Sequence, residues 1–102
     1  MSKTINIGTW NLCLGLANKK DYVKEKLKTE NIDICCLQEC EISPDLDEST
    51  LTLKDYKIEV EDNLYKKRSA IYIHNNINYE RQRHLEEQNN HVVIIDLKMV
   101  KE

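Results

Sequence analysis

The sequence predicts an α/β (α+β) fold with a mixed sheet, and three observations indicate this class. Residues 4–38 read as strand, helix and strand in succession, which is a βαβ unit. Several shorter apolar segments follow, separated by polar turns and without a second clear helix. The chain has 102 residues, which is enough for one small domain. We therefore expect a βαβ start followed by strands that can pair antiparallel.

The first strand and the helix are expected at residues 4–11 and at about residues 19–30. Ile5 and Ile7 alternate with polar residues in the strand. Asn18 is the expected helix N-cap, and Asp21 stands where the acid of a capping box would be. The apolar stripe of the helix consists of Tyr22, Val23 and Leu27.

The second strand, expected at residues 32–38, is apolar almost throughout, which favours cover on both faces and a parallel neighbour. Cys35 and Cys36 are adjacent in it, so their side chains should point to opposite faces. Together with Cys13 and Cys40 they lack the spacing of a zinc site. Reduced thiols that pack as small apolar groups are therefore expected.

The later strands are expected at residues 57–60, 70–74, 77–84 and 92–97. The segment at residues 92–95 is apolar on both strand faces, so both faces require cover. Only one clear helix is available for that purpose. We therefore expect either that the chain is a fragment or that a partner covers the bare face.

Polar side chains end both strands of the βαβ unit, with Asn11 after the first and Gln38-Glu39 after the second. The carboxyl ends of parallel strands meet at one edge of a sheet, where ligand sites tend to form. A carboxylate beside an amide oxygen suits a hard cation such as Mg²⁺, which completes its shell with water and phosphate oxygens. Such an ion can polarise a phosphoryl group.

The segments INIGTWN and DICCLQEC resemble the opening of the endonuclease/exonuclease/phosphatase superfamily, which includes AP endonucleases, DNase I-like nucleases, LINE-type retrotransposon nucleases and phosphoesterases. RSAIYI and VVIIDLKM are similar to two later strands of the family, with Ser69 where glycine is common. The resemblance implies a catalytic, metal-binding role for Glu39 and Asn11, with Mg²⁺ or Mn²⁺ as cofactor. Cys40 and the SAIYI strand favour the retrotransposon-type nucleases.

The resemblance covers nearly the whole chain but only the first part of the family's domain, a DNase I-like four-layer sandwich. Residues 1–102 are therefore expected to form a partial domain. The Gly-Asp-x-Asn and Ser-Asp-His segments that supply the general base are absent, and His74, His84 and His91 match neither. The implied function is part of a metal-dependent endonuclease that is inactive as this chain alone. A partner-bound, non-catalytic module and a phosphatase of the same superfamily remain alternatives.

The implied partner is nucleic acid, most simply DNA, although the net charge of −3 gives no strong electrostatic signature for it. The basic clusters at residues 19–20 and 66–68 are interpreted as solvated turns in preference to phosphate contacts. No signal peptide or membrane span is evident, so an intracellular location, nuclear or cytoplasmic, is expected. The oligomeric state is left open.

Overall fold

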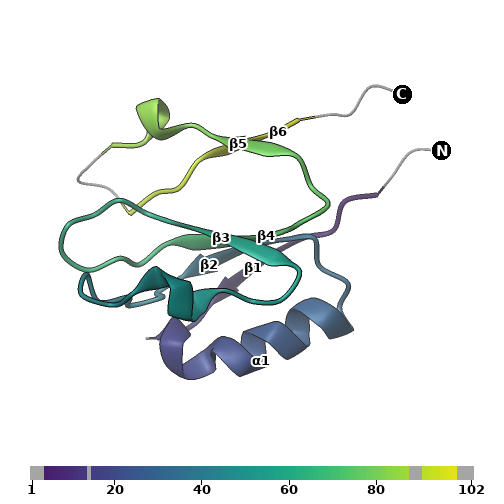
Figure 1. Cartoon of the computed structure of the whole chain (residues 1–102), viewed down its shortest axis with the longest axis horizontal. Coiled ribbons are helices and arrows are strands. Elements are labelled where there is room, and N and C mark those ends of the chain that lie inside the picture. The colour runs from purple at the N-terminus through teal and green to yellow at the C-terminus, as the bar shows by residue number, and fades with distance from the viewer. Residues whose placement is uncertain (1–3, 14, 88–90, 99–102) are drawn as a thin grey trace.

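The protein is represented by a computed structural model, which describes residues 4–13, 15–87 and 91–98. Figure 1 shows three layers, with the helix on one side of a four-stranded sheet and a small two-stranded sheet on the other. The elements are β1 (Ile7–Asn11), α1 (Leu16–Thr29), β2 (Ile34–Gln38), η1 (Glu48–Leu51), β3 (Tyr56–Val60), β4 (Ala70–His74), β5 (Tyr79–Arg81), η2 (Arg83–Leu85) and β6 (Ile95–Leu97).

The larger sheet has the strand order β1-β2-β4-β3. β1 and β2 are parallel and joined by α1, whereas β4 pairs antiparallel with both β2 and β3. The predicted α/β class and the βαβ start are therefore confirmed. The apolar run of β2 is explained by its central position, since it has a strand on either side and a layer above and below.

The start of α1 differs from the expectation, because the helix begins at Leu16 and its N-cap is Gly15. Asn18 and Asp21 lie inside the helix, and no side chain caps it. The N–H groups of Gly15 and Leu16 instead donate to the carbonyls of Glu39 and Cys40 at 3.1 and 2.7 Å. Gly15 has φ +133°, a conformation that L side chains rarely adopt. A backbone contact with the end of β2 thus replaces the predicted side-chain cap.

The apolar stripe of α1 was predicted correctly at two of its three positions. Val23 and Leu27 are buried in the larger core cluster, together with Cys35 and Tyr72. Tyr22 is mostly exposed, and its ring packs against Trp10 with the centroids 5.1 Å apart.

The second sheet covers the face of the larger sheet opposite α1. Ile34, Ile71, Ile73 and Ile77 form a separate apolar cluster on this face, and Val93 and Ile95 pack against it. Within the described residues the strands are shorter than expected, with β5 limited to Tyr79–Arg81 and β6 to Ile95–Leu97. The larger sheet therefore covers one face of β6, and the expectation that the chain is a fragment or that a partner covers the other face stays a prediction.

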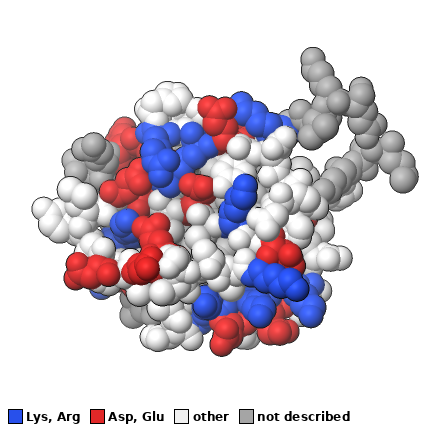
Figure 2. Space-filling model, in the orientation of Figure 1, with Lys and Arg blue, Asp and Glu red and all other residues white. Residues whose placement is uncertain are grey.

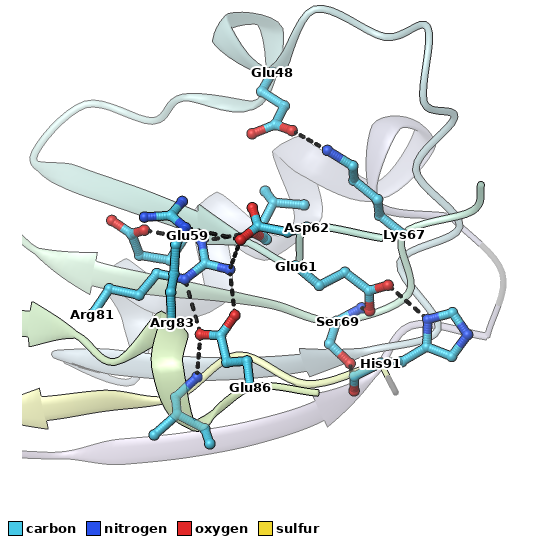
Figure 3. A network of polar contacts seen from close by, with 12 residues as sticks. Glu48, Glu59, Glu61, Asp62, Lys67, Ser69, Arg81, Arg83, Glu86 and His91 are labelled. Carbon is cyan, nitrogen blue, oxygen red and sulfur yellow. Dashed lines mark hydrogen bonds and ion pairs between the residues drawn. The ribbon is translucent and has the colours of Figure 1, made fainter. Parts of the chain in front are cut away.

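A polar network fastens the second sheet to the first (Figure 3). Arg81 of β5 is only 6% exposed, and its guanidinium contacts Glu86 at 2.9 Å and Glu59 of β3 at 3.3 Å. The hydroxyl of Tyr79 donates to the same Glu59 carboxylate at 2.5 Å. The side chains of Arg81 and Glu86 are almost fully buried and those of Glu59 and Tyr79 are partly buried, and these groups satisfy one another's hydrogen-bonding capacity.

The cysteines are free thiols, and the two in β2 face opposite layers as predicted. Cys35 belongs to the core on the helix side, whereas Cys36 packs against the cluster on the other side. Burial raises the pKa of Cys35 to about 11, so the thiol is inert at neutral pH. Among the helices of the described residues, none is long and apolar enough to cross a membrane.

Candidate functional site

Asn11 and Glu39 lie at the same edge of the larger sheet, where the pattern of the βαβ unit predicts them. Asn11, the last residue of β1, pairs with Gln38 of the parallel strand β2, and Glu39 follows directly. The side chains of Asn11 and Glu39 are both exposed. The structure thus brings the two predicted residues together, whereas their catalytic and metal-binding roles stay predictions.

A bulge in the chain sets the position of Glu39. Between β2 and the strand beside it, Leu37 pairs with Ala70 and Ile42 bridges to Lys67. Between these two pairs the chain advances five positions from Leu37 to Ile42 but only three positions from Lys67 to Ala70. The extra residues are accommodated at Glu39 and Glu41, whose φ angles are +54° and +50°. Bulges and left-handed non-glycine residues are concentrated at functional sites, because they aim side chains that regular strands cannot.

The backbone of Glu39 is held on both sides. Its carbonyl accepts from the N–H of Gly15 at 3.1 Å, and the next N–H, of Cys40, donates to the carbonyl of Arg68 at 2.9 Å. Among the described residues, none forms a hydrogen bond or ion pair with the Glu39 carboxylate. The result is an ionisable group on a fixed backbone that is free to bind a ligand.

The Asn11 side chain is held within its own loop. Its Oδ1 accepts from the N–H of Cys13 at 2.9 Å. A carbonyl oxygen has two lone pairs, so Oδ1 can accept this bond and also contact a cation. The neighbouring Gln38 is engaged elsewhere, since its Nε2 donates to Thr9 Oγ1 at 2.9 Å.

The donor set at this edge fits Mg²⁺ better than a cation that requires a full protein cage. Within residues 4–13, 15–87 and 91–98, no group of three His, Cys, Asp or Glu side chains could hold a metal ion. Mg²⁺ is usually bound by one or two carboxylates and keeps water and phosphate oxygens as its other ligands. One carboxylate and one amide oxygen meet that requirement in part.

A second polar cluster, which the sequence analysis did not predict, lies along the same edge of the sheet (Figure 3). Glu61, which follows β3, is 1% exposed, and its Oε1 lies 2.6 Å from His91 Nδ1. The N–H of Ser69 donates to the other oxygen of Glu61 at 3.0 Å, and the Ser69 hydroxyl donates to the His91 carbonyl at 2.7 Å. The sequence contained a signal for this cluster, because the acidic Glu61 follows the apolar segment of β3 just as Glu39 follows β2.

The basic turn at residues 66–68 is tied to the bulge. Lys66 Nζ contacts Glu41 at 2.7 Å and Arg68 Nε contacts it at 3.4 Å. The hydrogen bond from Lys66 holds the pKa of the Glu41 carboxyl below its usual value. Lys67 points elsewhere and pairs with Glu48 at 2.8 Å. This turn is thus ordered by specific contacts, which its interpretation as a solvated turn did not anticipate.

A hollow of about 550 Å³ lies at the opposite edge of the sheet and does not include the candidate residues. It is formed by the end of α1, the start of β2 and the end of β4. Its lining comprises Lys24, Leu27, Lys28, Asn31, Ile32, Asp33, Lys54, Asp55, Tyr56, His74 and Asn76.

The model of a family described as the Endonuclease/Exonuclease/phosphatase family matches residues 8–101. No curated protein matches the chain significantly. The family match begins within β1 and includes β2, β4 and β6, so it covers the segments that carry the resemblance described above.

Proposed function

Because the chain belongs to the endonuclease/exonuclease/phosphatase family, we propose that it forms the metal-binding edge of a phosphodiesterase that cleaves nucleic acid. The family supports a hydrolase of the nuclease or phosphatase type, generally dependent on a divalent metal. Cleavage of nucleic acid, by a nuclease of the LINE retrotransposon type, is the more specific part of the proposal.

One observation carries the proposal. Glu39 is held in a left-handed bulge with an exposed carboxylate, beside Asn11 at the end of a parallel strand pair. A left-handed non-glycine residue costs about 1–3 kcal/mol, so its presence at this position supports a functional requirement.

Glu39 and Asn11 would have different roles at the proposed metal site. Glu39 would supply the negative charge that holds Mg²⁺ or Mn²⁺, and Asn11 Oδ1 would contribute a neutral oxygen to the ion. The Nδ2 amide group of Asn11 would donate to a phosphate oxygen and so help to orient the phosphate. The bound ion supplies Lewis-acid stabilisation of the phosphoryl group and of the leaving oxygen. Both residues would be held in place, because Asn11 belongs to the paired strand β1 and the backbone at Glu39 is bonded to Gly15 and, through Cys40, to Arg68.

We propose further that this chain alone has little or no activity. The sequence contains neither the Asp-x-Asn nor the Ser-Asp-His segment that supplies a base in the family. Efficient Mg²⁺-dependent cleavage by the purified chain, abolished by Glu39→Gln, would contradict this part of the proposal.

The metal site can be tested without catalysis. Mn²⁺ titrated into ¹⁵N-labelled protein should broaden the amide signals of Asn11 and Gln38 before those of β5. Glu39→Gln should weaken Mn²⁺ binding about tenfold or more, since loss of even an indirect partner of a ligand costs that much. The matched control is Glu25→Gln, which removes the same charge from an exposed position of α1. Equal Mn²⁺ affinity of the two variants would refute the proposed metal site.

A non-catalytic binding module is the second candidate, and one observation favours it. β1 is an edge strand of the larger sheet, and Ile7 within it is 63% exposed. Exposed apolar edges are sites of pairing with other chains. A monodisperse monomer that binds no hydrophobic dye and unfolds cooperatively would argue against this function.

A further inference from the structure

We propose that Lys66, Arg68 and His91 form a phosphate-binding surface for one nucleic-acid strand, next to the Glu39 edge. These three residues are called the basic surface below. The inference rests on the proposed function, because the same strand would present the phosphate held at Glu39. It adds three binding residues and the form of the substrate, a single strand, to the proposal.

The side chains of the basic surface are exposed to solvent, and two carboxylates lie beneath them. Glu41 and Glu61 are 12% and 1% exposed, whereas Lys66, Arg68 and His91 are 59%, 54% and 37% exposed. An approaching ligand would therefore meet the two cations and the imidazole first. The two carboxylates fix the positions of these three side chains through contacts of 2.6–3.4 Å. Charged groups held in this way lose little conformational freedom when a phosphate binds.

His91 is oriented by contacts on its ring and on its backbone. Its Nδ1 lies 2.6 Å from Glu61 Oε1, and its carbonyl accepts from the hydroxyl of Ser69 at 2.7 Å. Nε2 is then the ring nitrogen left for a ligand. In the protonated imidazole Nε2 carries a hydrogen, and it can donate a charge-assisted hydrogen bond to a phosphate oxygen.

The basic surface is close to the proposed metal ligand. The carbonyl of Arg68 accepts from the N–H of Cys40, which directly follows Glu39. Ser69 likewise connects the backbone to Glu61, whose N–H donates to the Ser69 carbonyl at 3.2 Å. Neighbouring strands lie about 5 Å apart, so one short strand of nucleic acid can reach both places.

An exposed aromatic ring favours a nucleic-acid strand over free phosphate. Tyr65 directly precedes Lys66 and is 82% exposed. Single-strand binders combine basic groups that follow the backbone with aromatic rings on which bases stack. A free phosphate ion has no base and would gain nothing from this ring. Lys67 is left out of the basic surface because its side chain is only 19% exposed, against 59% for Lys66, and its ammonium contacts Glu48 away from this surface.

The overall charge does not oppose this inference. Figure 2 shows acidic and basic side chains interspersed over the visible face, consistent with the net charge of −3. Binding would therefore depend on a local arrangement of cations, and affinity should fall steeply with salt.

The test compares two double variants of equal charge in the full chain. Lys66→Gln/Arg68→Gln removes two cations from the basic surface. The control Lys24→Gln/Lys28→Gln removes two from the hollow at the opposite edge. Binding of a fluorescent 12-nucleotide single strand is measured in EDTA at several salt concentrations. The first variant should bind more weakly, and its log–log salt slope should fall by about 0.7 for each phosphate contact removed. The control should bind like the wild type.

Two further measurements test the proposal even if a double variant folds poorly. In the wild-type protein, the ring signals of His91 should shift on addition of the oligonucleotide, whereas those of His74 at the opposite edge should not. Tyr65→Ser should lower affinity about fivefold or more through lost stacking. Equal losses in the two double variants, or an unchanged His91 ring, would overturn the proposal. Binding of inorganic phosphate as tight as that of the oligonucleotide would refute a strand as the ligand.

Failure of this proposal and failure of the metal site give different results. Glu39→Gln should leave the binding measured in EDTA intact and should weaken only the additional binding produced by Mn²⁺. If Glu39→Gln has no effect on Mn²⁺ binding, the proposed metal site fails while the basic surface stands.

Discussion

Glu39 is in a backbone conformation that its side chain disfavours, at φ +54°. The bulge between Leu37 and Ile42 imposes this conformation, and the contacts to Gly15 and Arg68 maintain it. Glycine would adopt the same conformation without the clash of a Cβ atom. Stability and the proposed function are therefore expected to conflict at this one position.

We predict that Glu39→Gly raises the free energy of unfolding by about 0.5–1 kcal/mol, because the relieved left-handed strain exceeds the added entropy of the unfolded chain. The same substitution should abolish Mn²⁺ binding. Urea denaturation measures the first effect. Glu25→Gly in α1 is the control and should destabilise by about 1 kcal/mol, since glycine is a poor helix former. A loss of stability in both variants would show that Glu39 carries no strain.

At the scale of the elements, β5 and β6 are attached to the larger sheet by polar as well as apolar contacts. Their apolar contacts come from a small cluster on one face of the larger sheet. Arg81 adds a charged link, as its guanidinium reaches Glu59, Glu86 and the carbonyl of Val60. Breaking such a buried group leaves its carboxylate partners without compensation.

Arg81→Met is expected to destabilise the protein by about 3–5 kcal/mol, the usual cost of removing one partner of a buried ion pair. The control is Arg83→Met, whose partner Asp62 is exposed, and its effect should stay within about 1 kcal/mol. Thermal and urea unfolding of both variants measure the difference. Hydrogen exchange should show that protection is lost first in β5 and β6. Similar stability of the two variants would mean that Arg81 is not essential to the attachment.

At the scale of the whole molecule, several carboxyl groups have pKa values lowered by their partners. The hydrogen bond from Arg81 lowers the pKa of Glu86, and that from Arg83 lowers the pKa of Asp62. A carboxyl whose pKa is lower in the folded state stabilises the protein above its unfolded pKa. That stabilisation is lost as the pH falls through the folded pKa.

The free energy of unfolding should therefore decrease as the pH falls below the ordinary carboxyl values of 4.5 for Glu86 and 3.8 for Asp62. Urea denaturation at a series of pH values measures this slope. Glu86→Gln should be less stable than the wild type at neutral pH, and its stability should depend less on pH in the acid range. A parallel pH dependence in the two proteins would show that Glu86 does not contribute.

The sequence by itself determined the elements that rest on local patterns. Alternation and apolar runs located β1, β2 and β4, and β4 was predicted with its observed bounds at residues 70–74. Parallel pairing of β1 with β2 placed Asn11 and Glu39 at one edge, because strands joined by a helix run in the same direction. The opposite orientations of Cys35 and Cys36 followed from the two-residue period of a strand.

Only the tertiary structure decided the features that join distant parts of the chain. The N-terminus of α1 is fixed by carbonyls at positions 39 and 40, so a local capping rule misplaced it. Val93 and Ile95 cover the face of the larger sheet opposite α1, and Glu61 contacts His91, which lies thirty positions further along the chain. Such contacts depend on which segments the fold brings together, and neither composition nor periodicity encodes that pairing. The bulge at Glu39 likewise follows from the mismatch in length between two paired segments.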